Sequence, residues 1–159
     1  MIKFTHLAAV LEEYAIAVRN KYQDRLILHD KVASGELLNS IEFVTHFQGM
    51  DYWVGLRLED YWKYVEYGTD PHSAPYSKIY EWVRVKPVLP RPKNCKLPTP
   101  EQVAWAVWGK IKYHGTEETP DLRDTTKEMN ALFEQRITEA IDADMGDAID
   151  GVIRVLFTQ

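Results

Sequence analysis

The stretch IEFVTHFQGMDYWVGLRL, residues 41–58, decides the fold class of this chain. Its side chains alternate with a period of two over residues 41–48 and again over residues 52–58, which is typical of β-strands. Gly49-Met50-Asp51 separates the two runs and supplies a short turn. The sequence therefore predicts an antiparallel β-hairpin here.

Helical periodicity precedes the hairpin. From Thr5, which can cap a helix N-terminus, to about Asp30, apolar residues recur at steps of three and four. This spacing predicts one long helix over residues 5–30 with a single apolar face. Ser34 can then cap a short turn that runs through Leu38.

The residues after the hairpin carry mixed signals. Residues 59–67 have helical spacing and end at Gly68, which suits the left-handed conformation that closes a helix. Asp70-Pro71 and Ala74-Pro75 indicate an irregular loop. Residues 77–86 are rich in aromatic and β-branched side chains, and they fit either a short helix or a strand.

Prolines and cations dominate residues 84–98. Five of the eight prolines lie between Pro87 and Pro100, and residues 82–100 carry five basic side chains without an acidic one. Because proline prevents regular ladders, this part is expected to be an extended arm or an exposed loop. Its cations have no local acidic partners, so we expect the arm to pack on a neighbouring subunit or on another protein.

Two more helices are expected after the arm. Thr99-Pro100-Glu101-Gln102 is a capping box with proline at the first helical position, and Gly115 can end that helix. A last helix is expected from Thr125 or Thr126, with an apolar stripe that continues almost to the C-terminus. Glycine costs on the order of 1 kcal/mol in a helix interior, so a break at Gly146 or Gly151 fits the pattern.

The tripeptides Tyr67-Gly68-Thr69 and His114-Gly115-Thr116 are similar. We interpret them as two similar helix ends and not as an internal repeat. The acidic residues gather in residues 117–150, after the basic arm, and are expected to form a solvated helix face or to dock on a basic segment of a neighbour.

The composition is that of an ordinary globular protein. The chain has 159 residues, a net charge of −5, and 45% hydrophobic and 27% charged residues, which excludes wholesale disorder and a collagen-like structure. We predict an α+β fold in a single domain over residues 1–159, with its core in residues 1–80 and 99–157 and the arm in residues 84–98.

Several protein classes are excluded or disfavoured. No apolar run reaches the roughly 20 residues of a membrane helix, and no secretory signal is visible. Cys95 is the only cysteine and has no partner for an internal disulfide, so synthesis in a reducing cytoplasm is expected. A mildly acidic chain is also a poor candidate for wrapping nucleic acid.

Nothing in the sequence indicates catalysis. The five histidines are far apart and form no metal-binding motif with Cys or with one another. Asp142-Ala143-Asp144-Met145-Gly146 lacks the glycine position and the final glutamate of a calcium loop. Cys95 has no base beside it. We therefore expect no catalytic residue, no cofactor and no metal site.

Two motifs flank the predicted hairpin. Gly35, Leu37, Ser40 and Ile41 form a Gly-x-Leu-x-x-Ser-Ile turn before it, and Tyr64-Val65-Glu66-Tyr67-Gly68-Thr69 follows it. In this order, after a long helix, the motifs resemble the tail-completion, or head–tail joining, proteins of tailed bacteriophages. The resemblance covers about residues 1–80. The arm and the helix that follows it look like an insertion, similar to versions from crAss-like phages of the Bacteroides group.

The resemblance implies a non-enzymatic virion protein of the neck or tail, made in the host bacterial cytoplasm. It implies a homo-oligomeric ring of six- or twelve-fold symmetry between portal and tail, with other neck, portal and tail proteins as neighbours. DNA would pass through its channel without sequence-specific binding, and no membrane is involved. The residues expected at interfaces are Tyr64, Glu66, Tyr67, Gly68, Thr69, Arg84, Lys86, Arg91 and Lys93.

Plainer roles remain open for the same residues. Glu66 fits a solvated charge better than an intersubunit partner, and Tyr64 fits a core ring whose loss costs roughly 3 kcal/mol. The abundance of Tyr and Trp is compatible with an aromatic core as well as with interfaces. For the whole chain, the alternatives are a small adaptor or regulatory protein-binding module, suggested by the acidic helix, and a hydrolase with dispersed His and Asp residues.

Overall fold

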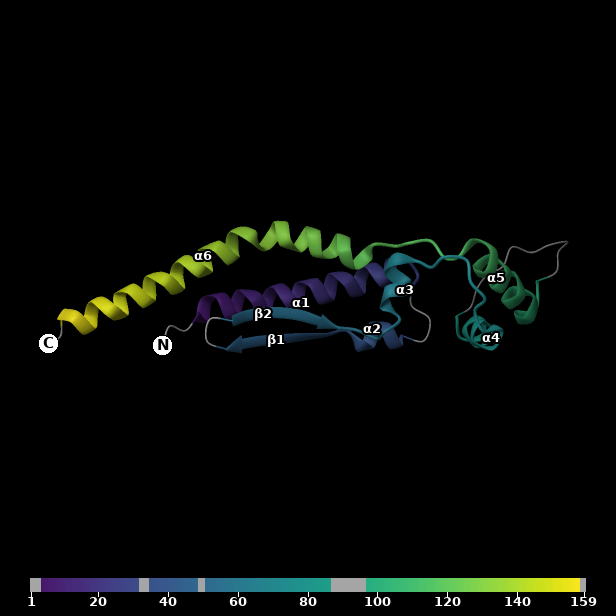
Figure 1. Ribbon diagram of the computed structural model, residues 1–159, viewed down its shortest axis with the longest axis horizontal. Helices are drawn as coiled ribbons and strands as arrows, with labels where there is room; N and C mark the ends of the chain where they lie inside the picture. Colours follow the sequence, from purple (N-terminus) through teal and green to yellow (C-terminus); the bar gives the residue numbers. More distant parts are fainter. Residues whose placement is uncertain (1–3, 32–34, 49–50, 87–96, 158–159) are drawn as a thin grey trace. The chain divides into compact units, whose positions relative to one another are not determined.

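The computed structural model describes residues 4–31, 35–48, 51–86 and 97–157, with side chains up to residue 150 (Figure 1). The protein is mostly helical with one small antiparallel sheet, so the predicted α+β class is confirmed. The elements are α1 (Thr5–Leu28), α2 (Glu36–Ser40), β1 (Glu42–Gln48), β2 (Asp51–Arg57), α3 (Trp62–Tyr67), α4 (Tyr76–Val85), α5 (Pro100–His114) and α6 (Asp121–Phe157).

The chain divides into two compact units, and neither is one continuous stretch of sequence. The first unit comprises Met1–Arg25, Ile41–Arg57 and Leu122–Gln159, and the second comprises Leu26–Ser40 and Leu58–Asp121. The single domain expected over residues 1–159 stays a prediction. None of the described helices has an apolar stretch long enough to cross a membrane.

The predicted hairpin is present in the first unit. β1 pairs with β2 in antiparallel register from Glu42 opposite Arg57 to Gln48 opposite Asp51. Leu56 of β2 packs against the cluster of Val18, Met129 and Phe133, which joins the sheet to α1 and α6. The turn residues Gly49 and Met50 lie outside the described part.

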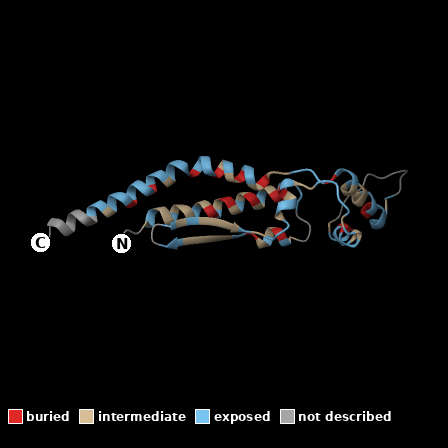
Figure 2. Ribbon diagram, viewed as in Figure 1, coloured by how far each residue is buried: buried red, intermediate tan, exposed pale blue. Residues whose placement is uncertain are grey.

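α1 follows the predicted pattern closely. Its buried residues Ala15, Val18, Tyr22 and Leu26 recur at steps of three and four. Figure 2 shows buried positions in red at intervals along this helix. The helix ends at Leu28, two residues earlier than expected. Asp30 has a positive φ of 52°, and Lys31 donates its N–H to the carbonyl of Leu26, which is how a left-handed residue closes a helix.

α6 begins four residues before the predicted start and runs without a break through Gly146 and Gly151. Thr125 is fully buried, and the hydroxyl of Thr126 donates to the carbonyl of Leu122, one turn earlier, at 2.8 Å. Threonine makes this internal bond as readily as a cap, so a cap-forming residue type did not identify the helix start.

The predicted apolar stripe of α6 is only partly buried. Met129 and Phe133 belong to the core, but four apolar residues of the stripe are exposed: Leu132, Ile141, Met145 and Ile149. The buried line of the helix is instead completed by small or polar residues, Ala140 and Asp144. Apolar periodicity alone therefore placed the buried face of this helix incorrectly.

α1 and α6 are joined by an N-terminal cap that comes from a distant residue. The carboxylate of Asp144, which is 1% exposed, accepts the N–H of His6 at 3.0 Å and that of Leu7 at 2.8 Å. It also accepts the hydroxyl of Thr5 at 3.4 Å. These donors belong to the first turn of α1, where the unsatisfied N–H groups and the helix dipole favour a negative charge.

Other polar contacts tie α6 to α1 along their length. Arg25 donates to Glu128 at 3.0 Å, and Lys21 lies 3.1 Å from the same carboxylate. These two partners hold the pKa of Glu128 below its ordinary value. Tyr14 donates its hydroxyl to the side-chain oxygen of Asn130 at 2.6 Å. The first unit is thus stabilised by polar side-chain contacts between α1 and α6 as well as by a small apolar core.

In the second unit, α4 and α5 share a core of Ile79, Val83, Val103 and Ala104. The undecided residues 77–86 are therefore helical, because Ile79 and Val83 lie one turn apart and face α5 together. The predicted capping box of α5 is confirmed: Gln102 donates its N–H to the Thr99 hydroxyl at 3.3 Å and accepts the Thr99 N–H at 3.0 Å.

The cap of α1 predicts a pH-dependent contribution to stability. Burial raises the pKa of Asp144, but the N–H groups of Leu7 and His6 outweigh it and hold the pKa below the ordinary 3.8. A lowered pKa in the folded state means that the cap stabilises the protein above about pH 4 and is lost as the pH falls through the folded value. We expect Asp144→Asn to lower the free energy of unfolding by about 2 kcal/mol near pH 6.

This loss should shrink towards zero near pH 2, as followed by urea unfolding and circular dichroism. Asp142→Asn is the matched control, because Asp142 is exposed on the same helix. A difference between Asp144→Asn and the natural chain that stays constant from pH 6 to pH 2 would contradict the assignment.

Candidate functional site

α3 carries the aromatic motif, and the motif residues on it differ strongly in exposure. Tyr64 and Tyr67 are 64% and 59% exposed, whereas Glu66 is 1% exposed. The expectation of a solvated Glu66 is therefore wrong, and the alternative of a core ring at Tyr64, which the sequence left open, does not hold. The sequence could not decide this, because a helix of six residues has no periodicity to fit.

Gly68 ends α3 in a conformation that only glycine adopts readily. Its φ is positive, as predicted, at 66°, but its ψ of −166° is extended and not left-handed helical. The chain therefore leaves α3 as an extended segment instead of closing in a helical cap. This geometry directs Thr69 towards Thr116, which follows α5.

Thr69 and Thr116 form a reciprocal bridge. Each donates its N–H to the carbonyl of the other, at 3.1 and 3.0 Å, and their hydroxyl oxygens lie 3.0 Å apart. Gly115 precedes Thr116 with φ 69° and ψ −156°, almost the conformation of Gly68. A Cβ at Gly68 would overlap the Thr116 carbonyl, and a Cβ at Gly115 would overlap the Thr69 carbonyl.

The similar tripeptides of the sequence are thus two halves of one contact. We interpreted Tyr67-Gly68-Thr69 and His114-Gly115-Thr116 as similar helix ends, which they are, but their pairing was missed. The repeated Gly-Thr after a helix was the available signal. The repeated Gly-Thr does not show that the two segments lie side by side, since the two threonines are 47 residues apart in sequence.

A groove lies beside this bridge, with a volume of about 650 Å³. We call it the aromatic groove and define it by Tyr61, Tyr64, Val65, Pro71 and His72. The bridge residues Gly68, Thr69 and Thr116, together with Asp70 and Ile111, complete its lining. The groove therefore contains three of the interface residues that the resemblance implies, Tyr64, Gly68 and Thr69, whereas Glu66 and Tyr67 do not line it.

The polar groups of the aromatic groove are few. The pKa of Tyr61 is raised, mainly by burial and also by the charges of Glu36 and Glu59. A hydrogen bond with the backbone of Leu37 opposes this shift. His72 lies with Nδ1 2.9 Å from the carbonyl of Asp70, which holds its ring across the loop. Among the described residues, no side chain or backbone group bonds the hydroxyl of Tyr64.

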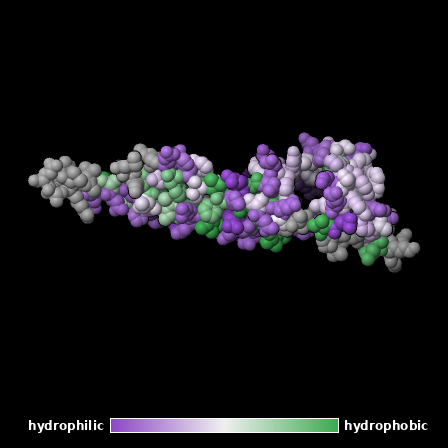
Figure 3. Space-filling view, turned by 90° about the horizontal axis from the view of Figure 1, so that it is seen from below, coloured by the Kyte–Doolittle hydropathy of each residue, from purple (hydrophilic) through white to green (hydrophobic). Residues whose placement is uncertain are grey.

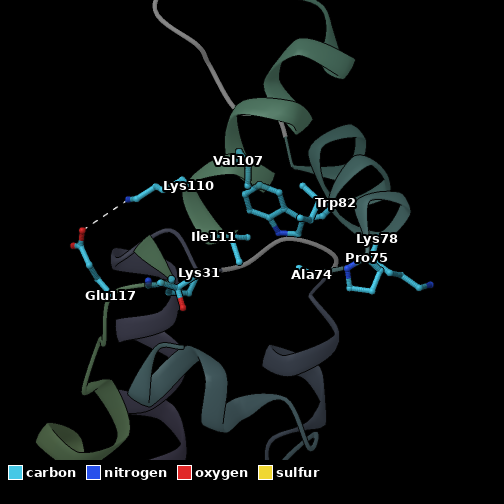
Figure 4. A pocket seen from close by; sticks show the side chains of 12 residues that line it. Lys31, Ala74, Pro75, Lys78, Trp82, Val107, Lys110, Ile111 and Glu117 are labelled. Atoms are coloured by element: carbon cyan, nitrogen blue, oxygen red, sulfur yellow. Dashed lines mark ion pairs between the residues drawn. The ribbon is translucent and has the colours of Figure 1, made fainter. Parts of the chain in front are cut away.

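A second hollow, of about 560 Å³, lies between α4 and α5 (Figure 4). Trp82, Val107 and Ile111 line its apolar part. Lys110 and Glu117 form an ion pair of 3.8 Å at its rim, drawn as a dashed line in Figure 4. Its lysines are exposed and its acids are few, so the geometry presents an apolar surface rather than a reaction centre.

The four arm residues expected at interfaces have different outcomes. Arg84 is exposed at the end of α4. Lys86 is largely covered, since its side chain is 15% exposed; it lies 3.1 Å from the carboxylate of Asp30 and also donates to the Asp30 carbonyl. The arm expected over residues 84–98 begins later than expected, because residues 84 and 85 belong to α4. Arg91, Lys93 and the rest of residues 87–96 lie outside the described residues.

The titratable side chains of the described residues do not gather into a metal site. No group of three or more His, Cys, Asp or Glu side chains among them could hold a metal ion. The histidines instead form separate pairs: His29 Nδ1 lies 2.6 Å from Asp121, and His46 stacks on Trp53 at 5.4 Å. Comparisons of the chain with protein-family models, curated proteins and solved structures found no match.

The bridge predicts a large effect of small substitutions at its glycines. We expect Gly68→Ala and Gly115→Ala each to lower the free energy of unfolding by more than about 2 kcal/mol, because a Cβ meets a fixed carbonyl and φ is positive. Urea unfolding measures this directly.

Gly109→Ala provides the matched control, since a Cβ at this position of α5 meets nothing within 4 Å. Alanine should leave the stability there unchanged or raise it by up to about 1 kcal/mol. If Gly68→Ala were as stable as Gly109→Ala, the bridge would not constrain the fold.

The exposures of the tyrosines predict contrasting stabilities. Tyr64→Ala and Tyr67→Ala should change the free energy of unfolding by less than about 1 kcal/mol, because both rings are mostly in solvent. Tyr22→Ala, which removes a fully buried ring from α1, should cost about 3–5 kcal/mol. Thermal and urea unfolding of the three variants test this, and a destabilised Tyr64→Ala would return that ring to the core.

Proposed function

We propose that this chain is a structural virion protein of a tailed bacteriophage, which forms a ring at the head–tail connector or tail-completion position. The observation that carries the proposal is the order of the two motifs around the hairpin, residues 35–41 before it and residues 64–69 after it. The resemblance to tail-completion proteins rests on this order.

The structure supports the proposal by giving each motif position a physical role. Gly35 has a φ of 82°, and Leu37 and Ile41 are buried. The Ser40 hydroxyl donates to the carbonyl of Leu37 at 2.9 Å and accepts the N–H of Glu59 at 3.3 Å, which ties the turn to the chain beyond the hairpin. These four positions of the first motif therefore form one structural unit with the chain that follows the hairpin.

The surface supports association with other protein. All fourteen Tyr and Trp residues lie in the described part, and Tyr22 is the one that is buried. Exposed apolar side chains occur in both units, including Ile141, Met145 and Ile149 on α6. Hydrophobic residues come to the surface in separate groups among hydrophilic ones (Figure 3). Exposed aromatic and aliphatic groups of this size are typical of interaction surfaces.

The function is that of a spacer and not of a catalyst. A ring of identical subunits uses heterologous contacts that close by rotation, so each subunit presents two different surfaces to its neighbours. Other portal, neck and tail proteins would bind its two rims. DNA would pass through the channel, and the net charge of −5 is compatible with passage without tight binding.

The proposal predicts a closed ring. Sedimentation velocity of the full chain at rising concentration should show one discrete oligomer, of six or twelve subunits, and negative-stain images should show rings. The portal protein encoded by the same genome serves as the partner, and a mixture should give the ring stacked on the portal.

The contrary result is equally well defined. A monomer or dimer at every concentration, with no ring beside the portal protein, would contradict the proposal and favour a small adaptor or regulatory module. Tyr113→Ala is a suitable control for surface effects, because this ring is 68% exposed and does not line the aromatic groove.

A further inference from the structure

The aromatic groove has the chemistry of a site for a proline-rich peptide. Extended proline-rich segments have no internal hydrogen bonds, and their rings pack into grooves lined by aromatic side chains. Tyr61, Tyr64 and His72 supply such side chains, and Pro71 and Val65 supply apolar wall. The Tyr64 hydroxyl has no partner among the described residues, so it can donate to a carbonyl of a docked segment.

The chain itself contains a segment of the matching kind. Residues 87–92 read PVLPRP, with prolines at the first, fourth and sixth positions. Three residues per turn of an extended proline helix place the first and fourth positions on the same side. Arg91 follows Pro90 and Lys93 follows Pro92, and residues 84–98 contain no acidic side chain.

The charges of the groove are opposite to those of the segment. Asp70 lines the groove and is exposed. Next to the lining in sequence, Glu59 and Asp60 precede Tyr61 and are exposed, whereas Glu117, after Thr116, is paired with Lys110. Lys63, on α3, is a cation and reduces this negative charge. An arginine beside Asp70 can form a two-point hydrogen bond with its carboxylate, which lysine cannot reproduce.

We propose that the segment of residues 87–93 of one copy binds in the aromatic groove of a second copy of this chain, with Arg91 paired to Asp70. This deepens the proposed function, because it names the contact between neighbouring subunits, and it rests on the proposed self-assembly. A donor segment and an acceptor groove on different parts of one chain are the two halves of a heterologous contact, which can repeat around a ring.

The test separates the two halves of the contact. A segment variant, Pro90→Ala with Arg91→Ala, keeps the groove, and a groove variant, Tyr64→Ala with Asp70→Ala, keeps the segment. Each variant alone should remain monomeric in sedimentation velocity. A mixture should form a one-to-one dimer that grows no further, because a single intact contact remains.

Controls and a charge exchange sharpen the result. Tyr113→Ala and Pro98→Ala should assemble as the natural chain does, since neither residue belongs to the groove or to residues 87–93. Asp70→Arg and Arg91→Asp should each abolish assembly, whereas the two together in one chain should restore it. Normal assembly of the segment variant or of the groove variant would overturn the inference. A mixture of the two that forms no dimer would also overturn it, and would mean that the segment binds within its own chain or elsewhere.

A peptide assay keeps the inference testable if the natural chain does not assemble. A fluorescent peptide of residues 86–94 should bind the segment variant, and Tyr64→Ala added to that variant should weaken binding at least about tenfold. A peptide of the same composition in scrambled order should not bind. Peptide binding with a monomeric chain would contradict the ring alone, whereas rings without peptide binding would contradict the groove contact alone.

Discussion

The reciprocal bridge between Thr69 and Thr116 is the constraint on which the second unit depends. It consists of two backbone hydrogen bonds and one contact between hydroxyls, yet it fixes the ends of α3 and α5 against each other. Gly68 lies against the carbonyl of Thr116, and Gly115 lies against the carbonyl of Thr69, so the two chain segments are too close to admit a Cβ at either glycine. The aromatic groove takes its lining from both sides of this bridge, so its shape follows from the positions of two glycines.

Local signals in the sequence predicted the local structure well. The hairpin, the body of α1 and the capping box of α5 were all accessible, because period-two alternation, helical spacing and a Thr-x-x-Gln pattern act within a few residues. Long-range contacts were not accessible. Asp144 caps a helix 137 residues away from it in sequence, as counted to Leu7, and the aspartate looks like any other polar residue of an acidic helix. The helical state of residues 77–86 likewise depended on packing against α5.

The candidate site was predictable in its residues but not in their roles. Tyr64, Val65, Gly68 and Thr69 do lie at the groove and its bridge. Glu66 is buried although the sequence favoured a solvated charge, and the alternative of a core ring at Tyr64, which the sequence left open, does not hold. The reason is that a six-residue helix has two exposed ends and few packing neighbours, so burial is decided by what the rest of the chain brings to it. Here Thr119 donates its N–H to the carbonyl of Glu66, from a segment that follows α5.

The difference between buried and exposed motif residues also bears on function. Gly35, Ser40, Glu66 and Gly68 are occupied with holding their own subunit together, through positive φ, hydrogen bonds and burial. These residues therefore stabilise the local fold, and their side chains are little available for contact with a neighbouring molecule. Tyr64 and Tyr67 are the motif residues whose large rings face solvent, on the short helix that leads into the bridge. A tyrosine ring has few rotatable bonds and loses little conformational entropy on binding, so the difference between a ring subunit and an adaptor lies in what covers these two tyrosines.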